Sequence, residues 1–209
     1  MSTAVLTTDG CYLTVEEYLA SEPLSEVKRE YLGGQVYAMA GASDPHNIIA
    51  SNLAGMLYNC LRGQQCRPFG SDMRLRLQQP GGTYFYYPDA MIACDPTDVG
   101  KGWRERPAAL FEILSDSTRQ IDAREKRAAY LGLGSLDAYV RIEQARAEVI
   151  VERRTSNGGW QMERHLGVAA TVRLPGKLGM IELPLAELYE GVTLPSPVAA
   201  DSAPASEPG

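Results

Sequence analysis

The 209-residue sequence predicts a mixed α/β fold of α+β character, in which a largely antiparallel sheet is flanked by helices. Two observations support this prediction. Apolar segments of strand length are separated by two-residue turns such as Asn157-Gly158, and a long helical period of apolar residues stands among them. No apolar run approaches the roughly 18 residues that a membrane span needs. The order of elements favours one domain, with a mixed sheet flanked by helices and additional antiparallel hairpins.

The first helix and the first hairpin are indicated by the residues at their ends. Thr14 followed by Glu17 is a capping-box pattern, which predicts a short helix over residues 14–20. Gly33-Gly34 lies between two apolar segments, a pattern typical of a β-hairpin. Both elements are therefore predicted from local sequence alone.

A longer helix is predicted after Asp44. This residue would be its N-cap, and Pro45 would occupy the first helical position. Gly63 would end the helix. The side chains that recur at spacings of three and four, and so share one face, are His46, Ile49, Leu53, Met56 and Cys60.

The remaining elements follow from strand-like apolar runs and one further capping box. Strands are predicted at 67–77, 84–94, 108–114, 138–142, 148–154 and 160–165, and helices at 122–133 and 185–189.

Composition divides the chain into a domain with two acidic ends. We expect residues 1–11 to be poorly ordered, residues 12–194 to form the domain, and the Pro/Ala/Ser-rich residues 195–209 to be disordered. The formal charge is −6, but residues 1–26 hold five acidic side chains and no Lys or Arg, and the tail holds two more. The body between them therefore carries a net charge of +1, so overall acidity does not exclude a nucleic-acid partner.

The N-terminal residues lack the charged and apolar regions of a secretory signal, and we expect a cytoplasmic protein. The four cysteines form no CxxC pair, which argues against a closed zinc site and favours reduced thiols packed as small apolar groups. The sequence also has no Walker loop, dinucleotide fingerprint or Gly-x-Ser-x-Gly turn, so nucleotide-cofactor and serine-nucleophile chemistry rank low.

Glu112 is the most unusual residue, because it interrupts the apolar run 108–114. An uncompensated carboxylate in a buried strand costs several kcal/mol or shifts its pKa upward. It is interpreted either as structural, in a buried ion pair or at a strand end that faces a cleft, or as a functional acid.

Asp89 repeats this pattern at the start of the apolar run that follows Pro88. Proline lacks an N–H and therefore stands at a strand start or a bulge. Alone, Pro-Asp is more often a turn than a site. If its strand neighbours that of Glu112, the two carboxylates form a candidate Mg²⁺ (or Mn²⁺) site.

Lys126 would lie in the first turn of the helix at 122–133, where the helix dipole disfavours a cation. One interpretation is an Asp122–Lys126 pair on a solvated face. The other places the ammonium beside the carboxylates, where it would orient water or stabilise charge on a phosphate. Arg119, Arg124 and Arg127 add a basic cluster that could contact phosphates.

Three further residues are weaker candidates. His46 is at the start of the apolar helix face, where a satisfied, half-buried histidine is the commoner explanation. Glu30 and Asp72 are acids that precede or lie within strand-like segments.

The ordered set of motifs resembles the Uma family of restriction endonucleases, part of the PD-(D/E)XK nuclease superfamily, over about residues 12–192. The segments that carry the resemblance are Glu30-Tyr-Leu-Gly-Gly-Gln, Gly41-Ala-Ser-Asp-Pro-His46-Asn47, Ser71-Asp72-Met-Arg, Tyr87-Pro88-Asp89, Phe111-Glu112-Ile-Leu-Ser115-Asp-Ser117-Thr118 and Asp122-Ala-Arg-Glu-Lys126-Arg-Ala-Ala-Tyr130.

The resemblance implies a restriction-endonuclease-like core and divalent-metal-dependent cleavage of DNA phosphodiester bonds. It makes Asp89 and Glu112 the metal-binding acids and Glu30 an upstream acid. With them, His46 and Asp72 would line the cleft. A homodimer is expected by analogy with enzymes that cut both strands.

One position departs from the superfamily pattern, which has a lysine two residues after the glutamate. Here that position is Leu114, and Lys126 on the following helix looks like the substitute. The departure leaves two alternatives open beside the endonuclease: a cleavage-inactive interaction or DNA-binding module that retains the fold, and a small-molecule hydrolase that uses the same acids.

Overall fold

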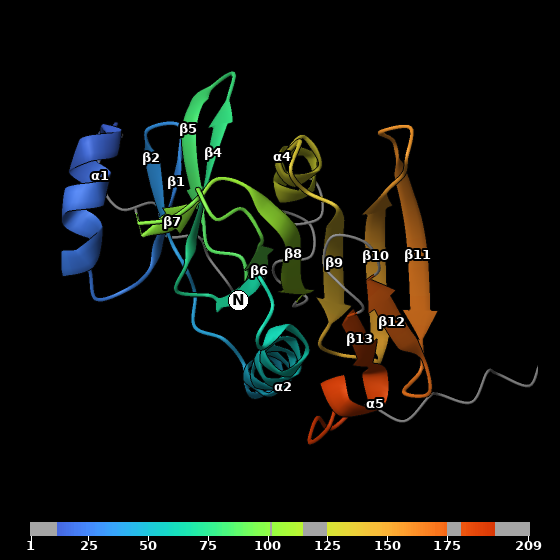
Figure 1. The fold of residues 1–209 in the computed structure, drawn as a ribbon. Helices are drawn as coiled ribbons and strands as arrows, with labels where there is room; N and C mark the ends of the chain where they lie inside the picture. The colour runs from blue at the N-terminus through green and yellow to red at the C-terminus, as the bar shows by residue number, and fades with distance from the viewer. Residues whose placement is uncertain (1–11, 101, 115–124, 175–180, 195–209) are drawn as a thin grey trace, which may run out of the picture.

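The computed structural model describes residues 12–100, 102–114, 125–174 and 181–194. The two ends of the chain for which we expect disorder, 1–11 and 195–209, lie outside these residues. Two large sheets face each other across the molecule, and helices pack at their sides and between them (Figure 1). The mixed α+β class predicted from the sequence is confirmed.

The first sheet has five strands in the order β2-β1-β5-β4-β7. Their bounds are β1 Arg29–Leu32, β2 Gln35–Ala38, β4 Arg74–Gln79, β5 Gly82–Tyr86 and β7 Trp103–Arg104. All neighbours pair antiparallel except β4 and β7. Helix α1, Val15–Ser21, lies on the outer side of this sheet (Figure 1) and is followed by the short 3₁₀ helix η1, Glu22–Leu24.

The second sheet has six strands in the order β11-β10-β9-β8-β6-β3. Their bounds are β3 Arg67–Gly70, β6 Ala90–Ala93, β8 Pro107–Leu114, β9 Ala138–Glu143, β10 Glu148–Arg154 and β11 Trp160–Leu166. The central pair β8 and β9 runs parallel, and the other neighbours run antiparallel. A separate hairpin pairs β12, Thr171–Leu174, with β13, Ile181–Pro184.

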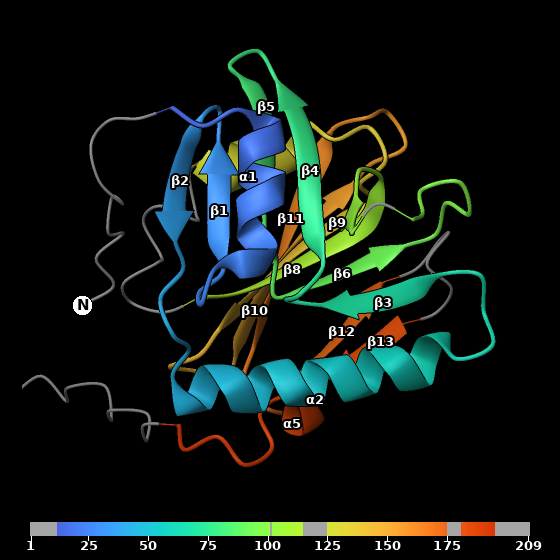
Figure 2. The ribbon, with the colours of Figure 1, turned by 90° about the vertical axis from the view of Figure 1, so that its left-hand side faces the viewer.

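Helices cover both faces of the six-stranded sheet. The long helix α2, Asp44–Leu61, runs across the lower end of the molecule beside β3, β13 and the short helix α5, Leu185–Leu188 (Figure 2). The opposite face meets helix α4, Arg127–Leu131, which packs between the two large sheets (Figure 1). None of the described helices is both long and apolar enough to cross a membrane.

The hydrophobic core has separate clusters on the two faces of the six-stranded sheet, because the side chains along a strand point alternately to opposite faces. One cluster joins α2 and α5 to β6, β8, β9 and β10 through residues such as Leu53, Phe111 and Val140. A second, around Tyr130 and Leu110, fills the space between the two sheets. Glu112 therefore shares a face with Leu110, two positions before it, and points toward the space between the sheets.

Several predicted elements are confirmed. Thr14 caps α1 in a complete capping box with Glu17, and Gly33 and Gly34 form the β1–β2 turn with positive φ angles of 58° and 107°. Gly158, with a φ of 83°, lies in the turn between β10 and β11.

Four predictions about the elements were wrong in detail. The N-cap of α2 is Ser43 rather than Asp44, and the buried side chains of this helix are Ile49, Leu53, Leu57 and Leu61, so its core face is rotated from the predicted one. The predicted strand 67–77 is two strands, β3 and β4, which belong to different sheets. The predicted strand 84–94 is likewise β5 and β6, interrupted at residues 87–89. Strands β7, β12 and β13 were not predicted.

The expectation of four reduced thiols was also wrong. Cys66 and Cys94 form a disulfide that links the ends of β3 and β6. The register explains this, because Arg67 pairs with Ala93 and the next two residues outward are the cysteines. Cys60 is a free thiol.

Candidate functional site

Two neighbouring strands of the six-stranded sheet place Asp89 and Glu112 together. Strand β6 pairs antiparallel with β8, with Ala90 opposite Phe111. Continued by one step, this register brings Asp89, the residue before β6, next to Glu112 of β8. The interruption at Pro88 ends β5 and begins β6, so that Asp89 stands at the edge of the paired region.

Glu112 lies deep in the molecule. All eight residues of β8 are buried, and Glu112 is 4% exposed. Its Oε1 accepts a hydrogen bond of 2.9 Å from the Tyr130 hydroxyl and lies 4.0 Å from the Lys126 Nζ. The buried charge therefore has both a hydrogen-bond donor and a cation to compensate it.

Asp89 is held by two donors on different elements. The backbone N–H of Ile113 donates to its Oδ2 at 2.6 Å, and His46 Nε2 lies 3.1 Å from its Oδ1. His46 is in the first turn of α2, so this helix is connected directly to the acid. The Nδ1 atom of His46 is buried and has no hydrogen-bond partner among the described residues.

Lys126 lies between the two large sheets with only 10% of its side chain exposed. Its Nζ is 2.9 Å from Glu30 Oε1, besides its contact with Glu112, and it lies 5.7 Å from the centre of the Tyr86 ring. The ammonium thus contacts acids from both sheets, Glu30 on β1 and Glu112 on β8. The alternative partner Asp122 lies outside the described residues.

Glu30 completes this group from the five-stranded sheet. Besides Lys126, its Oε1 accepts a hydrogen bond of 3.2 Å from the backbone N–H of Tyr87. Tyr87 is two residues before Asp89, so the interrupted segment 87–89 connects the Glu30 carboxylate to the second sheet. We call Glu30, His46, Asp89, Glu112 and Lys126 the acidic cluster; each was a candidate from the sequence.

The tyrosines that line the cluster remain protonated at neutral pH. Burial raises the pKa of Tyr130 well above its usual value, and the neighbouring charges of Glu112 and Glu30 raise it further. Burial also raises the pKa of Tyr86, with added contributions from Glu125 and Glu30. Both phenols are therefore neutral hydrogen-bond donors rather than bases.

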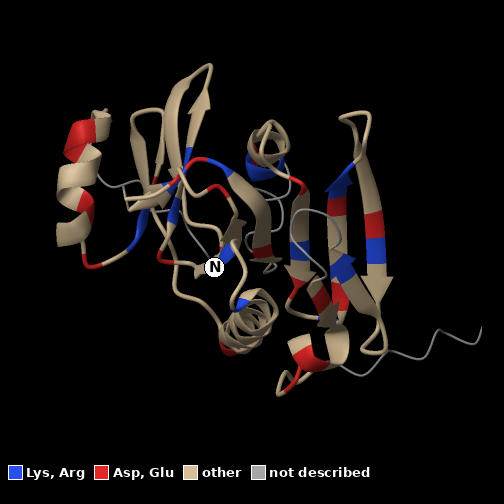
Figure 3. Cartoon of the chain, in the orientation of Figure 1, with Lys and Arg blue, Asp and Glu red and all other residues tan. Residues whose placement is uncertain are grey.

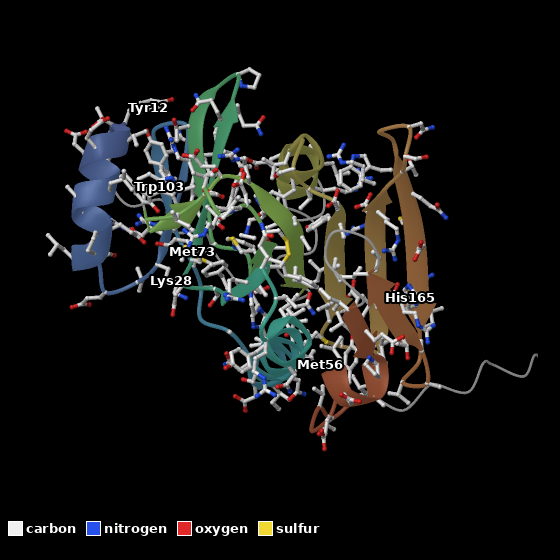
Figure 4. The ribbon with its side chains drawn as sticks, viewed as in Figure 1. Tyr12, Lys28, Met56, Met73, Trp103 and His165 are labelled. Carbon is white, nitrogen blue, oxygen red and sulfur yellow. A yellow bond between two sulfur atoms is a disulfide. The ribbon has the colours of Figure 1, made fainter. Side chains whose placement is uncertain are left out.

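The other predicted residues are bound elsewhere. Asp72 pairs with Lys28 at 2.6 Å and its side chain is 93% exposed; Figure 4 labels Lys28 at the edge of the five-stranded sheet. Arg127 forms an ion pair with the buried Glu152 of β10. The hydrogen bond raises the pKa of this arginine. Arg119 and Arg124 lie outside the described residues.

Charges of both signs lie near each other on the strands beyond Glu112. Arg141 of β9 is in register with Glu112 and pairs with Glu152 at 3.3 Å. Figure 3 shows acidic and basic residues side by side on β10 and β11. His165, on β11, belongs to this region and not to the acidic cluster (Figure 4).

The sequence analysis did not identify three groups that contact the cluster: the Tyr130 hydroxyl and the backbone N–H groups of Tyr87 and Ile113. Backbone donors leave no signal in a sequence. Tyr130 did leave one, because it follows Lys126 by four residues and a helix brings such residues to one face.

The carboxylate oxygens of the acidic cluster suit a hard divalent cation such as Mg²⁺, but the cluster offers few of them. Asp89 and Glu112 supply carboxylate oxygens from neighbouring positions at the start of β6 and in β8, and Mg²⁺ is commonly held by one or two carboxylates together with water. Among the described residues, no group of three or more His, Cys, Asp or Glu side chains is arranged to hold a metal ion. A metal here would therefore take its remaining ligands from water, backbone oxygens or substrate.

Comparisons with known proteins agree with this architecture. Two uncharacterized proteins of Synechocystis sp. are each 29% identical to the chain: slr1290 over 86% of this chain and 93% of its own length, and sll1609 over 77% and 91%. A crystal structure of a putative nuclease belonging to DUF820, from Anabaena variabilis, has the same fold. It matches with a TM-score of 0.68 and 19% identity, and the match covers 87% of this chain and 99% of that one. Residues 15–186 match the Uma2 family, described as putative restriction endonuclease. The chain belongs to the Uma2 family.

Proposed function

We propose that this protein is a Mg²⁺- or Mn²⁺-dependent endonuclease that hydrolyses phosphodiester bonds in DNA. Family membership supports nuclease chemistry in general, and the Anabaena protein of the same fold bears the description of a nuclease. The acids Asp89 and Glu112 would hold the metal. When bound, the metal would lower the pKa of a water molecule and neutralise charge on the phosphate.

The protein side chains have separate roles in this proposal. The Lys126 ammonium is a preorganised positive charge beside the carboxylates, and it stabilises the negative charge that develops on the phosphate oxygens. Glu30 fixes the position of that ammonium through its 2.9 Å contact. His46 and the Ile113 N–H hold the two oxygens of Asp89.

The observation that carries the proposal is the position of Lys126. The residue in the usual lysine position, Leu114, is 2% exposed and apolar, so an active site needs a cation from elsewhere. The ammonium of Lys126 lies within 4.0 Å of both Glu30 and Glu112. The helix dipole disfavours a cation at the start of a helix, and at the start of α4 the two acids compensate this cost for Lys126.

A cleavage-inactive module that retains the fold is the second candidate. It is favoured by the same ion pairs, because a lysine held at 2.9 Å by Glu30 balances the charge of the acids without any metal. In that case the domain would bind DNA or another partner without cutting.

The experiment that separates these candidates is a cleavage assay. Purified protein is incubated with supercoiled plasmid and with single-stranded DNA in the presence of Mg²⁺ or Mn²⁺, beside an Asp89→Ala/Glu112→Ala double variant. We expect nicking or linearisation by the wild type only, and its loss in EDTA. Equal cleavage by both proteins, or by neither, would contradict the proposed enzyme.

We further propose a single domain over residues 12–194, a cytoplasmic location and a homodimer, since two sites cut a duplex more readily than one. Because the body of the chain is nearly neutral, we expect weak DNA binding that depends on metal and decreases with salt. Arg119, Arg124 and Arg127 remain the proposed phosphate contacts, and Asp72 remains a proposed residue of the cleft.

A further inference from the structure

Tyr130 lies at the centre of the aromatic cluster between the two sheets. Its side chain is fully buried. The ring meets Tyr86 edge to face at 5.6 Å between centroids and meets Tyr139 at 5.4 Å, with interplanar angles of 89° and 87°. These contacts come from β5 of one sheet and β9 of the other, so both sheets fix the position of the phenol.

The hydroxyl of this fixed ring is aimed at Glu112. It donates to Oε1 at 2.9 Å, and the Lys126 ammonium approaches the same oxygen at 4.0 Å. Lys126 and Tyr130 are one helical turn apart, and both reach the carboxylate from the same face of the α4 segment. A hydroxyl donor from α4 and the cation at its N-cap thus approach the same oxygen of Glu112.

We infer that Tyr130 is a positioning residue, which orients the Glu112 carboxylate for the metal through a hydrogen bond to Oε1. This inference rests on the proposed function. Groups that donate to a metal-binding side chain fix its orientation, and their removal typically weakens metal binding by about 10- to 100-fold. The Glu112 side chain would otherwise rotate about its own bonds.

The arrangement has a parallel on the other acid. His46, from the first turn of α2, contacts Asp89 Oδ1 as Tyr130, from α4, contacts Glu112 Oε1. Each proposed metal ligand therefore has one side-chain partner from a helix. The ring of Tyr130 is the more rigidly held of the two, because aromatic neighbours enclose it.

The test is the Tyr130→Phe variant, which removes the hydroxyl and keeps the ring with its edge contacts. Mn²⁺ binding is measured by isothermal titration calorimetry on the full chain, after circular dichroism has verified the fold. We expect the Mn²⁺ dissociation constant to rise by about 10-fold or more. In the plasmid assay kcat should fall while the KM for DNA stays unchanged, because the Tyr130 side chain is fully buried and out of reach of a DNA molecule at the surface.

Tyr189→Phe is the matched control. This buried phenol donates to the backbone carbonyls of Glu143 and Glu148, at 2.7 and 2.9 Å, in the other large core cluster. Its loss should lower the thermal unfolding temperature and leave Mn²⁺ affinity unchanged. If both variants lose affinity together, the effect is general destabilisation and the positioning role is wrong.

The remaining outcomes separate this inference from the proposed function. Wild-type protein that binds Mn²⁺, with Tyr130→Phe binding equally well, would overturn the role of Tyr130 and leave the metal site standing. Wild-type protein that does not bind Mn²⁺ would overturn the proposed function, and the inference with it.

Discussion

Replacement of Lys126 by methionine tests whether the acidic cluster depends on this one cation. Methionine fills a similar volume but has neither the charge nor the N–H donors of lysine, so Glu30 and Glu112 would be left buried without the ammonium between them. Their side chains are 13% and 6% exposed, and that of Lys126 is 10% exposed. At an effective dielectric constant of about 20, a charge pair 4 Å apart attracts by about 4 kcal/mol. Removal of one partner from a buried pair typically costs about 3–5 kcal/mol. We therefore expect Lys126→Met to lower the free energy of unfolding by about 3 kcal/mol or more in EDTA.

The matched control is Lys28→Met. Lys28 pairs with Asp72 at an even shorter distance, 2.6 Å, but the two side chains are 39% and 93% exposed. Solvent-exposed pairs contribute about 1 kcal/mol or less. Urea denaturation followed by circular dichroism at pH 7.5 measures both variants. A Lys126→Met protein no less stable than Lys28→Met would refute the view that the lysine compensates buried acids.

Three other predictions concern the groups around the cluster. Burial and nearby carboxylates raise the pKa of Tyr130. Its contribution to stability is therefore complete below the unfolded pKa of about 10 and is lost as pH rises above it, by up to about 1.4 kcal/mol per pH unit. Urea titrations at alkaline pH should show a shallower decline of stability with pH in Tyr130→Phe than in the wild type, and an equal slope would contradict this assignment. Because the Cys66–Cys94 disulfide closes a loop with a sequence separation of 28, its reduction should lower the free energy of unfolding by about 3 kcal/mol. Denaturation with and without dithiothreitol measures this change. A protein whose stability is unaffected by the reductant would show that the thiols are not paired. His46→Ala should weaken Mn²⁺ binding by about 10-fold with little change in fold, which calorimetry and circular dichroism measure. Unchanged Mn²⁺ affinity would show that the contact of His46 with Asp89 has no part in metal binding.

Elements whose signals are local were predicted well. The capping box of Thr14 and the Gly33-Gly34 turn are set by a few adjacent residues, and both occur as expected. Strand β8 was predicted from its apolar run because it is buried on both faces. In these cases tertiary contacts reinforce what the local sequence already favours.

The division of apolar segments between the two sheets was not predicted, because an apolar pattern does not show which sheet a residue joins. The segments 67–77 and 84–94 each have a continuous strand-like pattern, and yet each divides between the two sheets. What separates β5 from β6 is the segment around Pro88, whose Tyr87 N–H binds Glu30 from another strand. Such a partner becomes visible only when the sheet has formed.

The candidate site was predictable in its acids and less so in their partners. Glu112 and Asp89 stand out because charged residues rarely interrupt buried strands. Lys126 contacts Glu30, which is far away along the chain, at 2.9 Å, and no periodicity connects the two. The ion pair of Asp72 with Lys28 at the surface was likewise not predicted from the motif that contains Asp72.

The most direct test of the account is to locate the metal. We propose to crystallise the wild-type chain with Mn²⁺ and to measure anomalous diffraction at the manganese absorption edge. The account predicts a peak in direct contact with the carboxylates of both Asp89 and Glu112, and no such peak in the Asp89→Ala/Glu112→Ala variant. A manganese ion bound elsewhere, or an empty site with Lys126 still paired to Glu30 and Glu112 at saturating Mn²⁺, would contradict it.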